Sequence, residues 1–147
     1  MMKNSLTGLL VFSAALALIA GCGAKAYSPV PINSAADVCA QCGMTVRDNG
    51  YASEIVTKDG KALKFDDVGD LFKYITENTN LDIGEEFVQD RNTKEWLILN
   101  KAVLITNTSV RTPMGWGIHA FKTAEEAAKF SASLTNSGNT GTKDKMM

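Results

Sequence analysis

The sequence predicts an α+β fold, a small domain of two pseudo-repeated strand–strand–helix (ββα-type) units packed together. A tight-turn signal, Asp59-Gly60, separates two segments rich in strand-forming residues and predicts a β-hairpin over about 51–65. Two segments, 66–78 and 122–134, have the capping residues and apolar spacing of helices. Each helix follows a strand-like segment that ends in phenylalanine, and this shared order indicates two related units.

The N-terminus has the pattern of a bacterial lipoprotein signal peptide over residues 1–21. After one lysine, an uncharged apolar run extends from Leu9 to Ala20, which is within the roughly 7–15 residues of a signal-peptide core and short of the ~20 that cross a bilayer. Ala20 and Gly21 directly before Cys22 resemble a lipobox, which implies cleavage before Cys22 and a lipid on its sulfur. An ordinary signal peptide or a short membrane anchor is the alternative. We expect an extracytoplasmic protein, lipid-anchored to the bacterial cell membrane, or to the outer membrane of a Gram-negative cell.

Two segments of small polar residues flank the predicted domain, which spans 38–134. Residues 22–37 contain the lipidated cysteine and two prolines, and they predict a flexible tether. Residues 135–147 are small and polar and predict a disordered tail.

The first predicted helix follows the hairpin directly. Val68, Leu71, Phe72 and Ile75 occur at positions i, i+3, i+4 and i+7, which is the spacing of one helical face. Asp66 or Asp67 is a suitable N-cap for this helix.

The remaining elements are further strands and a last helix. The segments 84–92 and 94–108 predict two or three strands. The helix over 122–134 opens with Thr123, and Glu126 three residues later completes a capping-box pattern.

A short internal similarity relates the two helices and the strands before them. Aligning Phe65 with Phe121 also places Asp67 on Thr123. Short similarity of this kind also arises by chance, so duplication and coincidence are both open. In either case a sulfur-bearing loop precedes each unit, "CGM" in the first and "PMGWG" in the second, and the two loops can face each other.

Composition and charge exclude several functions. The formal net charge of −1 argues against nucleic acid as a partner and against an electrostatic hold on anionic lipid. We find no general base, no nucleophile with a partner and no phosphate-binding loop, so the sequence predicts that the protein is not an enzyme.

The residues with the clearest chemical role are cysteines and methionines, which are candidate metal ligands. Cys39 and Cys42 have the spacing that closes on one ion, and Gly43 allows the backbone to turn toward Met44. Met114 lies in the second loop, before a glycine, rather than on the apolar stripe of a helix or strand. Thiolate and thioether sulfurs are soft donors that together favour Cu(I).

Two further residues lie near the second sulfur loop. His119 is the only histidine of the chain, and it is a candidate ligand or a structural residue of a strand. Trp116 lies between two glycines and is expected to act as a lid or a packing anchor.

Other uses of the two cysteines fit the sequence less well than copper binding does. Structural zinc wants four Cys or His ligands, and only three candidates exist once Cys22 carries lipid. Calcium and magnesium want carboxylate loops that the sequence lacks. A thiol oxidoreductase would place the motif at the start of a helix, and a Cys39–Cys42 disulfide would close a very small loop. A thiol–disulfide or structural lipoprotein with that disulfide and no metal is therefore the alternative function.

The lipobox, the "CAQCGM" segment and the "TPMGWGIHAF" segment together resemble the NosL family of copper-binding lipoproteins. The resemblance covers roughly residues 38–130. It implies a duplicated ββα-type fold, an extracytoplasmic Cu(I) site, and delivery of copper to nitrous oxide reductase or another exported cuproenzyme. The matching motifs carry over Cys39, Cys42, Met44 and Met114 as copper ligands, with His119 as a further candidate, and they leave open which cysteine binds the metal.

Overall fold

The computed structural model describes residues 25–138, with side chains to residue 135. Its elements in chain order are β1 (Ser53–Thr57), β2 (Ala62–Phe65), α1 (Val68–Glu77), β3 (Ile83–Gln89), β4 (Trp96–Ile98), the 3₁₀ turn η1 (Leu99–Lys101), β5 (Val103–Thr106), β6 (Ile118–Phe121) and α2 (Ala124–Gly138). The predicted α+β class is confirmed. The signal peptide and Cys22 lie outside the described residues, as does the tail from residue 139.

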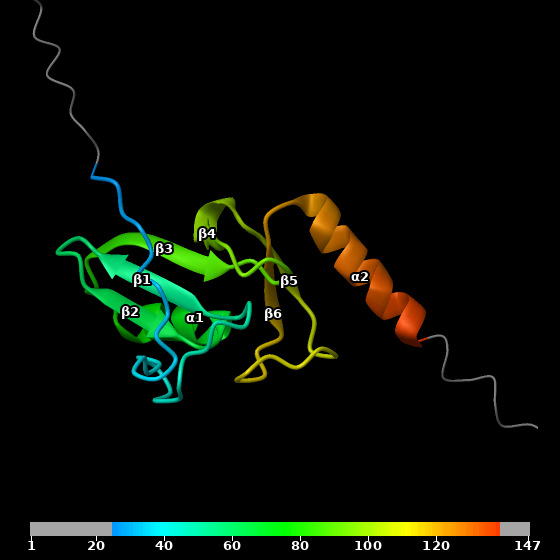
Figure 1. The fold of residues 1–147 in the computed structure, drawn as a ribbon, viewed down its shortest axis with the longest axis horizontal. Coiled ribbons are helices and arrows are strands. Elements are labelled where there is room, and N and C mark those ends of the chain that lie inside the picture. The colour runs from blue at the N-terminus through cyan, green and yellow to red at the C-terminus, as the bar shows by residue number, and fades with distance from the viewer. Residues whose placement is uncertain (1–24, 139–147) are drawn as a thin grey trace, which may run out of the picture.

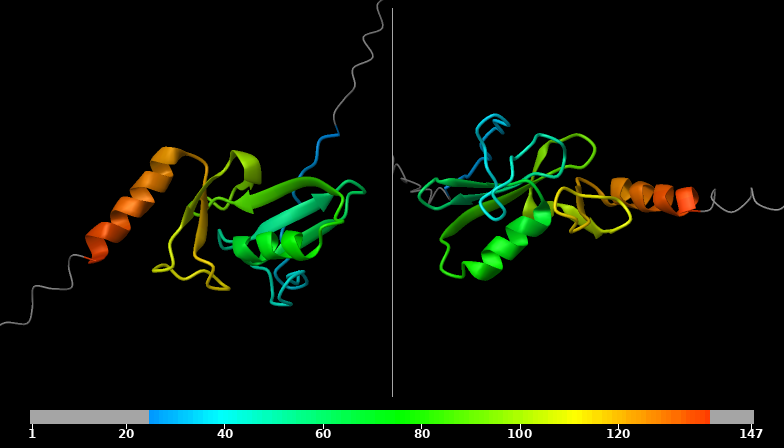
Figure 2. Two further views of the ribbon diagram at one scale, coloured as in Figure 1. Left: turned by 180° about the vertical axis from the view of Figure 1, so that it is seen from behind. Right: turned by 90° about the horizontal axis from the view of Figure 1, so that it is seen from below.

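The larger sheet has the strand order β2-β1-β3-β4, and all its neighbouring strands are antiparallel. β1 and β2 form the predicted hairpin, with Ser53 opposite Phe65 and Glu54 opposite Lys64. Because side chains alternate between the faces of a strand, Ser53 and Phe65 face α1, whereas Glu54 and Lys64 face the other side. Figure 2 shows this sheet with α1 on one face and the N-terminal segment on the other.

Helix α1 begins as its sequence predicts. Asp67 is the N-cap, and its carboxylate accepts a hydrogen bond from the backbone N–H of Gly69 at 3.0 Å. Val68 and Leu71 are buried against the sheet. The helix therefore fixes its first turn, and the aspartates in it, against the end of β2.

The second unit is the β5–β6 hairpin with α2 packed on it (Figure 1). The predicted capping box is present: Glu126 N–H donates to Thr123 Oγ1 at 3.2 Å, and Thr123 N–H donates to Glu126 Oε2 at 3.1 Å. The helix continues to Gly138, beyond the predicted end at residue 134, so the first residues of the predicted disordered tail are helical. No glycine or proline interrupts the chain before Gly138, and the Thr135 hydroxyl donates to the Ser131 carbonyl within the helix.

The residues aligned by the internal similarity occupy equivalent places in the two units. Phe65 and Phe121 end β2 and β6, and both are fully buried. Asp67 and Thr123 cap the helices that follow. The sheets are unequal, because β3 and β4 join the first one only. Internal duplication stays a prediction.

Residues 25–37, which we call the N-terminal strap, lie along the sheet face opposite α1. The Val30 N–H donates to Glu54 Oε1 at 2.8 Å, and the Lys64 ammonium contacts Asp37 Oδ2 at 2.6 Å and the Pro31 carbonyl at 2.8 Å. This stretch belongs to the segment that the sequence predicts as a flexible tether. Its partners Glu54 and Lys64 are 24 and 27 residues away from Val30 and Asp37 in the chain, so no local pattern predicts the contact.

Within the described part of the chain, no helix combines the length and apolar character that a bilayer crossing requires.

Truncation of Leu71 should test the packing of α1. Leu71 is fully buried, so Leu71→Ala should lower the free energy of unfolding by about 2–5 kcal/mol through lost burial and a residual cavity. Chemical denaturation measures this loss. Leu104→Ala is the matched control, because Leu104 is 36% exposed on β5 and should cost much less. Equal losses in the two variants would contradict the packing described here.

Candidate metal centre

The Cys39–Met44 loop is closed by its own backbone. The Cys39 N–H donates to the Met44 carbonyl at 2.7 Å, and the Gly43 N–H donates to the Cys39 carbonyl at 3.0 Å. Gly43 has φ +75°, a conformation that glycine adopts without steric cost. The turn brings Cys39 and Cys42 onto one side, and the Cys42 N–H donates to Cys39 Sγ at 3.4 Å.

Two carboxylates face the two thiols. Cys39 Sγ donates to Asp70 Oδ2 at 3.4 Å, and Cys42 Sγ donates to Asp66 Oδ1 at 3.3 Å. One ligand atom from each of these four residues lies within 4.8 Å of the others. We call Cys39, Cys42, Asp66 and Asp70 the thiol–carboxylate cluster. Both cysteines are free thiols, with Cys39 buried and Cys42 partly exposed.

The aspartates reach the cluster because α1 starts immediately after β2. Asp66 directly precedes the N-cap Asp67, and Asp70 lies in the first turn of the helix, so both belong to the junction that the cysteine loop contacts. The loop is tied to β2 by the Ala40 N–H, which donates to the Lys64 carbonyl at 2.9 Å. Sequence reasoning considered Asp66 only as a cap and did not consider Asp70. The three aspartates clustered about the predicted helix start were the available signal, but nothing in the local sequence showed that the cysteines contact two of them.

The surroundings keep both thiols protonated in the metal-free domain. Burial raises the pKa of Cys39, although backbone N–H groups near its sulfur act in the opposite direction. Burial also raises the pKa of Cys42, and the carboxylates of Asp70 and Asp66 raise it further because they disfavour a nearby thiolate. A bound cation would replace these protons and relieve the repulsion between thiolate and carboxylate.

The second sulfur loop is held at the same helix start. The Met114 N–H donates to Asp67 Oδ2 at 2.9 Å, and Trp116 Nε1–H donates to Asp70 Oδ1 at 2.8 Å. Trp116 lies over Gly69, where an added Cβ would be only 2.0 Å from the Trp116 Cγ atom. Trp116 is thus a packing anchor, as the sequence predicts, and its indole holds the carboxylate that contacts Cys39.

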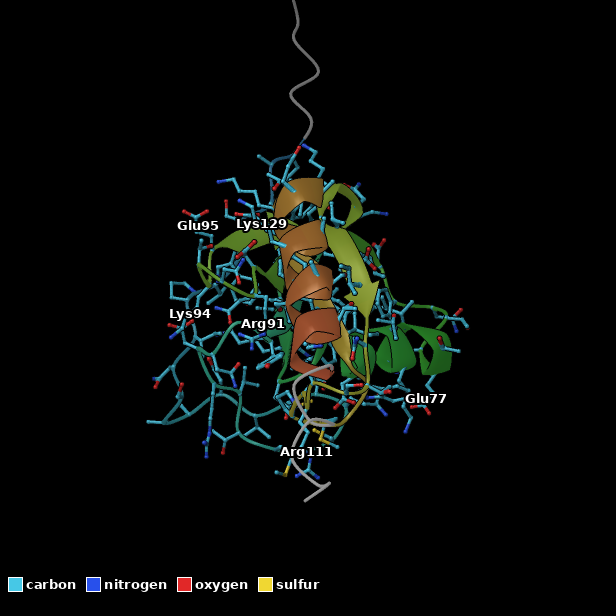
Figure 3. The ribbon with its side chains drawn as sticks, turned by 90° about the vertical axis from the view of Figure 1, so that its right-hand side faces the viewer. Glu77, Arg91, Lys94, Glu95, Arg111 and Lys129 are labelled. Carbon is cyan, nitrogen blue, oxygen red and sulfur yellow. The ribbon has the colours of Figure 1, made fainter. Side chains whose placement is uncertain are left out.

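The two methionines lie at the surface beside the cluster. Met44 is 56% exposed and Met114 is 41% exposed. Met44 lines a cavity of about 510 Å³ together with Asp66 and Pro113, and Met114 lines a neighbouring cavity of about 570 Å³ that also includes Pro113. Figure 3 shows the sulfur atoms gathered at the end of the molecule where Arg111 is labelled. The expectation that the two sulfur loops lie together is therefore confirmed.

His119 lies in the core of the second unit, outside the thiol–carboxylate cluster. Its ring is buried between those of Tyr51 and Phe130, with centroid distances of 5.9 and 4.8 Å. Nε2 is 3.4 Å from the Asn107 carbonyl, and burial lowers the pKa of the imidazole. The structure thus brings four of the five predicted ligands to one end, gives His119 a packing role, and adds two aspartates.

The residues of this end fit a metal ion. Two thiols supply soft donors, the methionines add thioethers within reach of the surface, and the aspartates supply harder oxygen donors. The aspartates also weaken the sequence-based argument against zinc, because two cysteines and two carboxylates complete a set of four donors.

Comparisons with known proteins give the family and the fold. A family model described as NosL matches residues 29–144. The crystal structure of the copper chaperone NosL from Shewanella denitrificans is similar to this structure with a TM-score of 0.65. The sequences are 21% identical, and the match covers 74% of this chain and 89% of that chain. No curated protein sequence matches the chain. At this identity, the structural match shows a shared fold.

Gly69→Ala should displace Trp116. The new methyl group would overlap the indole, so the Trp116–Asp70 hydrogen bond should break and the domain should lose about 1–3 kcal/mol of stability. Tryptophan emission, measured with Trp96→Phe as background, should shift to the red. Lys129→Ala, at an exposed position of α2, should leave the emission unchanged. An unshifted Gly69→Ala spectrum would contradict the contact.

The thiols should make the metal-free domain less stable at alkaline pH. Their folded pKa values lie above the ordinary value of 9.0, so the folded state holds the protons more tightly than the unfolded state. The resulting stabilisation is complete below pH 9.0 and is lost as the pH rises above it. Urea unfolding at pH 7 and pH 10 should show a larger alkaline loss in the wild type than in Cys39→Ser/Cys42→Ser. Equal losses would mean that the thiols are not perturbed.

Proposed function

The chain belongs to the NosL family, and we propose that it binds Cu(I) outside the cytoplasm and delivers it to an exported cuproenzyme, most specifically nitrous oxide reductase. The observation that carries this proposal is that the Cys39 and Cys42 thiols and the exposed methionines Met44 and Met114 lie at the same end of the domain. The copper chaperone from Shewanella denitrificans, which has the same fold, supports it.

Binding begins with loss of the thiol protons. Asp70 and Asp66 accept the hydrogen bonds of Cys39 and Cys42, so they are placed to receive these protons as Cu(I) approaches. Thiolate sulfur then holds the soft cation, and the methionine thioethers complete its coordination from the surface side. Since each thiolate must form first, affinity falls as the pH falls.

Release uses the exposed side of the same site. Thioether sulfur binds Cu(I) without charge, and Met44 and Met114 are accessible to a docked partner. A partner's ligands can replace the thioethers first and the thiolates second, so copper is never free in solution. This order suits transfer better than storage, and it requires no catalytic residue, so we propose a carrier and not an enzyme.

The lipobox-like sequence before Cys22 supports lipid anchoring at the extracytoplasmic face of a bacterial membrane. An anchored carrier meets copper where it is exported and where cuproenzymes mature. Nitrous oxide reductase is proposed as the client through the family resemblance, and another exported cuproenzyme is the alternative.

Titration with Cu(I) against a competing chelator should give one ion per domain. Met114→Leu removes a thioether at similar volume, so it should weaken binding by about tenfold or more without unfolding the domain. Cys39→Ser/Cys42→Ser should abolish tight binding. Leu104→Met, which adds a thioether on the exposed face of β5, is the control and should not change the affinity. Unchanged affinity in both the Met114 and the cysteine variants would refute a copper site here.

The same titration with Zn²⁺ separates copper from the Cys₂Asp₂ zinc alternative. A zinc site would depend on the carboxylates, so Asp66→Asn/Asp70→Asn would weaken zinc strongly and copper less. A thiol count on the untreated protein identifies the disulfide alternative: no reactive thiols and no metal binding would favour it.

Deletion of the gene should lower the copper content and activity of nitrous oxide reductase while leaving its polypeptide level near normal. Added copper should restore part of the activity, because the client can then load without a carrier. Metal analysis of the purified enzyme from copper-limited cells is the measurement. A fully loaded enzyme in the deletion strain would exclude this client.

A further inference from the structure

We infer that the N-terminal strap fixes the orientation of the domain relative to its lipid anchor, an arrangement that we call the fixed mount. In this orientation the β1–β2 turn lies against the phospholipid headgroups, and the thiol–carboxylate cluster faces the aqueous space. The inference rests on the proposed lipidation of Cys22. The partner that contacts the β1–β2 turn is the phospholipid surface.

The strap runs along the larger sheet, from the β1–β2 turn toward the cysteine loop. Lys25 Nζ donates to the Lys58 carbonyl at 2.6 Å, where β1 has just ended. Val30 then reaches Glu54, near the start of β1, and the Lys64 ammonium holds Pro31. The strap is thus antiparallel to β1, and it leads directly into Cys39. In Figure 1 the described chain starts at the upper left, and the cysteine loop is at the bottom.

Several independent contacts hold the strap in place. Glu54 is fully buried beneath it and accepts the Val30 N–H. Lys64 is nearly buried, and Asp37 pairs with it at 2.6 Å. The Tyr27 ring lies so close to Gly84 that a Cβ there would be 2.5 Å from Tyr27 Cε1. The strap is therefore fixed along most of its length, from Tyr27 to Asp37.

Little chain remains between the fixed strap and the anchor. Only Gly23 and Ala24 separate Cys22 from Lys25. Three residue steps span at most about 11 Å, so the Cα of a lipid-bearing Cys22 must stay within that distance of Lys25. A longer excursion would break the Lys25–Lys58 hydrogen bond and would then lift the Tyr27 ring from Gly84. The end of the domain that contains Lys25 must then lie at the membrane surface.

The side chains at this end suit a headgroup surface. Lys25, Lys58 and Lys61 supply three positive charges, while Asp59 and Asp82 supply two negative ones, and Lys58 pairs with Asp82 at 2.6 Å. The balance is nearly neutral, so the covalent anchor rather than charge holds this end at the lipid. The mount should therefore depend little on ionic strength.

The cluster lies toward the other end of β1. Five residue steps separate Lys58 from Ser53, which is about 17 Å at strand spacing. The Ser53 hydroxyl donates to the Asp67 carbonyl, so this end of β1 adjoins the start of α1 and the cluster. Copper is consequently exchanged with partners that approach from the water and not along the lipid surface.

Paramagnetic relaxation tests the orientation. The full-length lipidated protein is placed in phospholipid nanodiscs with a small fraction of gadolinium-chelating headgroups, and amide signals are compared with those in diamagnetic discs. Amides of 58–61 should lose at least twice as much intensity as those of 43–45 and 114–117. Similar losses at the two ends, or the reverse order, would overturn the fixed mount.

Two variants separate the strap from the anchor. Insertion of eight Gly/Ser residues between Ala24 and Lys25 keeps the strap but lengthens the link, so the difference between the two ends should shrink. Lys64→Met removes the strap's ion pair and should also reduce the difference in signal loss between the two groups of amides. If this variant fails to fold, the insertion variant alone decides. A difference that survives the insertion would overturn the inference.

Mass spectrometry of the same sample distinguishes failure of the inference from failure of the proposed anchoring. An unlipidated Cys22 would overturn both. A lipidated Cys22 with uniform relaxation would overturn only the fixed mount and leave the copper-binding proposal intact.

Discussion

Three carboxylates at the start of α1 hold together the parts of this domain that bear sulfur. Asp67 caps the helix and also accepts the backbone N–H of Met114. Asp70 contacts the Cys39 thiol with one oxygen and the Trp116 indole with the other. Negative charge is favourable at a helix N-terminus, so α1 itself stabilises this arrangement. These contacts of Asp67 and Asp70 fix the two sulfur loops relative to each other.

This arrangement combines a protected interior with an accessible surface. The thiols lie among carboxylates in a partly dry environment, which keeps them protonated until a cation arrives. The methionines lie outside, and their uncharged thioether sulfurs are accessible from the solvent. A carrier needs both properties, because it must hold its cargo against water and yield it to a partner.

The N-terminal strap is likewise held in place by charged side chains. It leads into the cysteine loop, and its hydrogen bond to Glu54 and its ion pair with Lys64 lie on the sheet face that α1 leaves free. These contacts are costly to break, since the buried Glu54 carboxyl group and the nearly buried Lys64 ammonium would lose their partners. The strap therefore fixes the path by which the chain enters the cysteine loop.

The sequence by itself determined the features that depend on neighbouring residues. The hairpin about Asp59-Gly60, the cap at Asp67 and the capping box of Thr123 and Glu126 were predictable because turns and caps are local. The α+β class followed from them, and the soft-donor chemistry followed from side-chain type. The relative placement of the two units did not follow, because it depends on contacts between distant segments.

Only the tertiary structure decided the roles of Asp66, Asp70, His119 and the strap. Asp70 joins Cys39 across 31 residues and Trp116 across 46, and no periodicity links such positions. His119 is close to Met114 in sequence, but the β5–β6 pairing turns its ring into the core beside Phe130. The strap resembles a linker in composition, and its order comes from Glu54 and Lys64, whose burial depends on the folded sheet. Long-range burial and electrostatics made these assignments, and such terms exist only once the chain has folded.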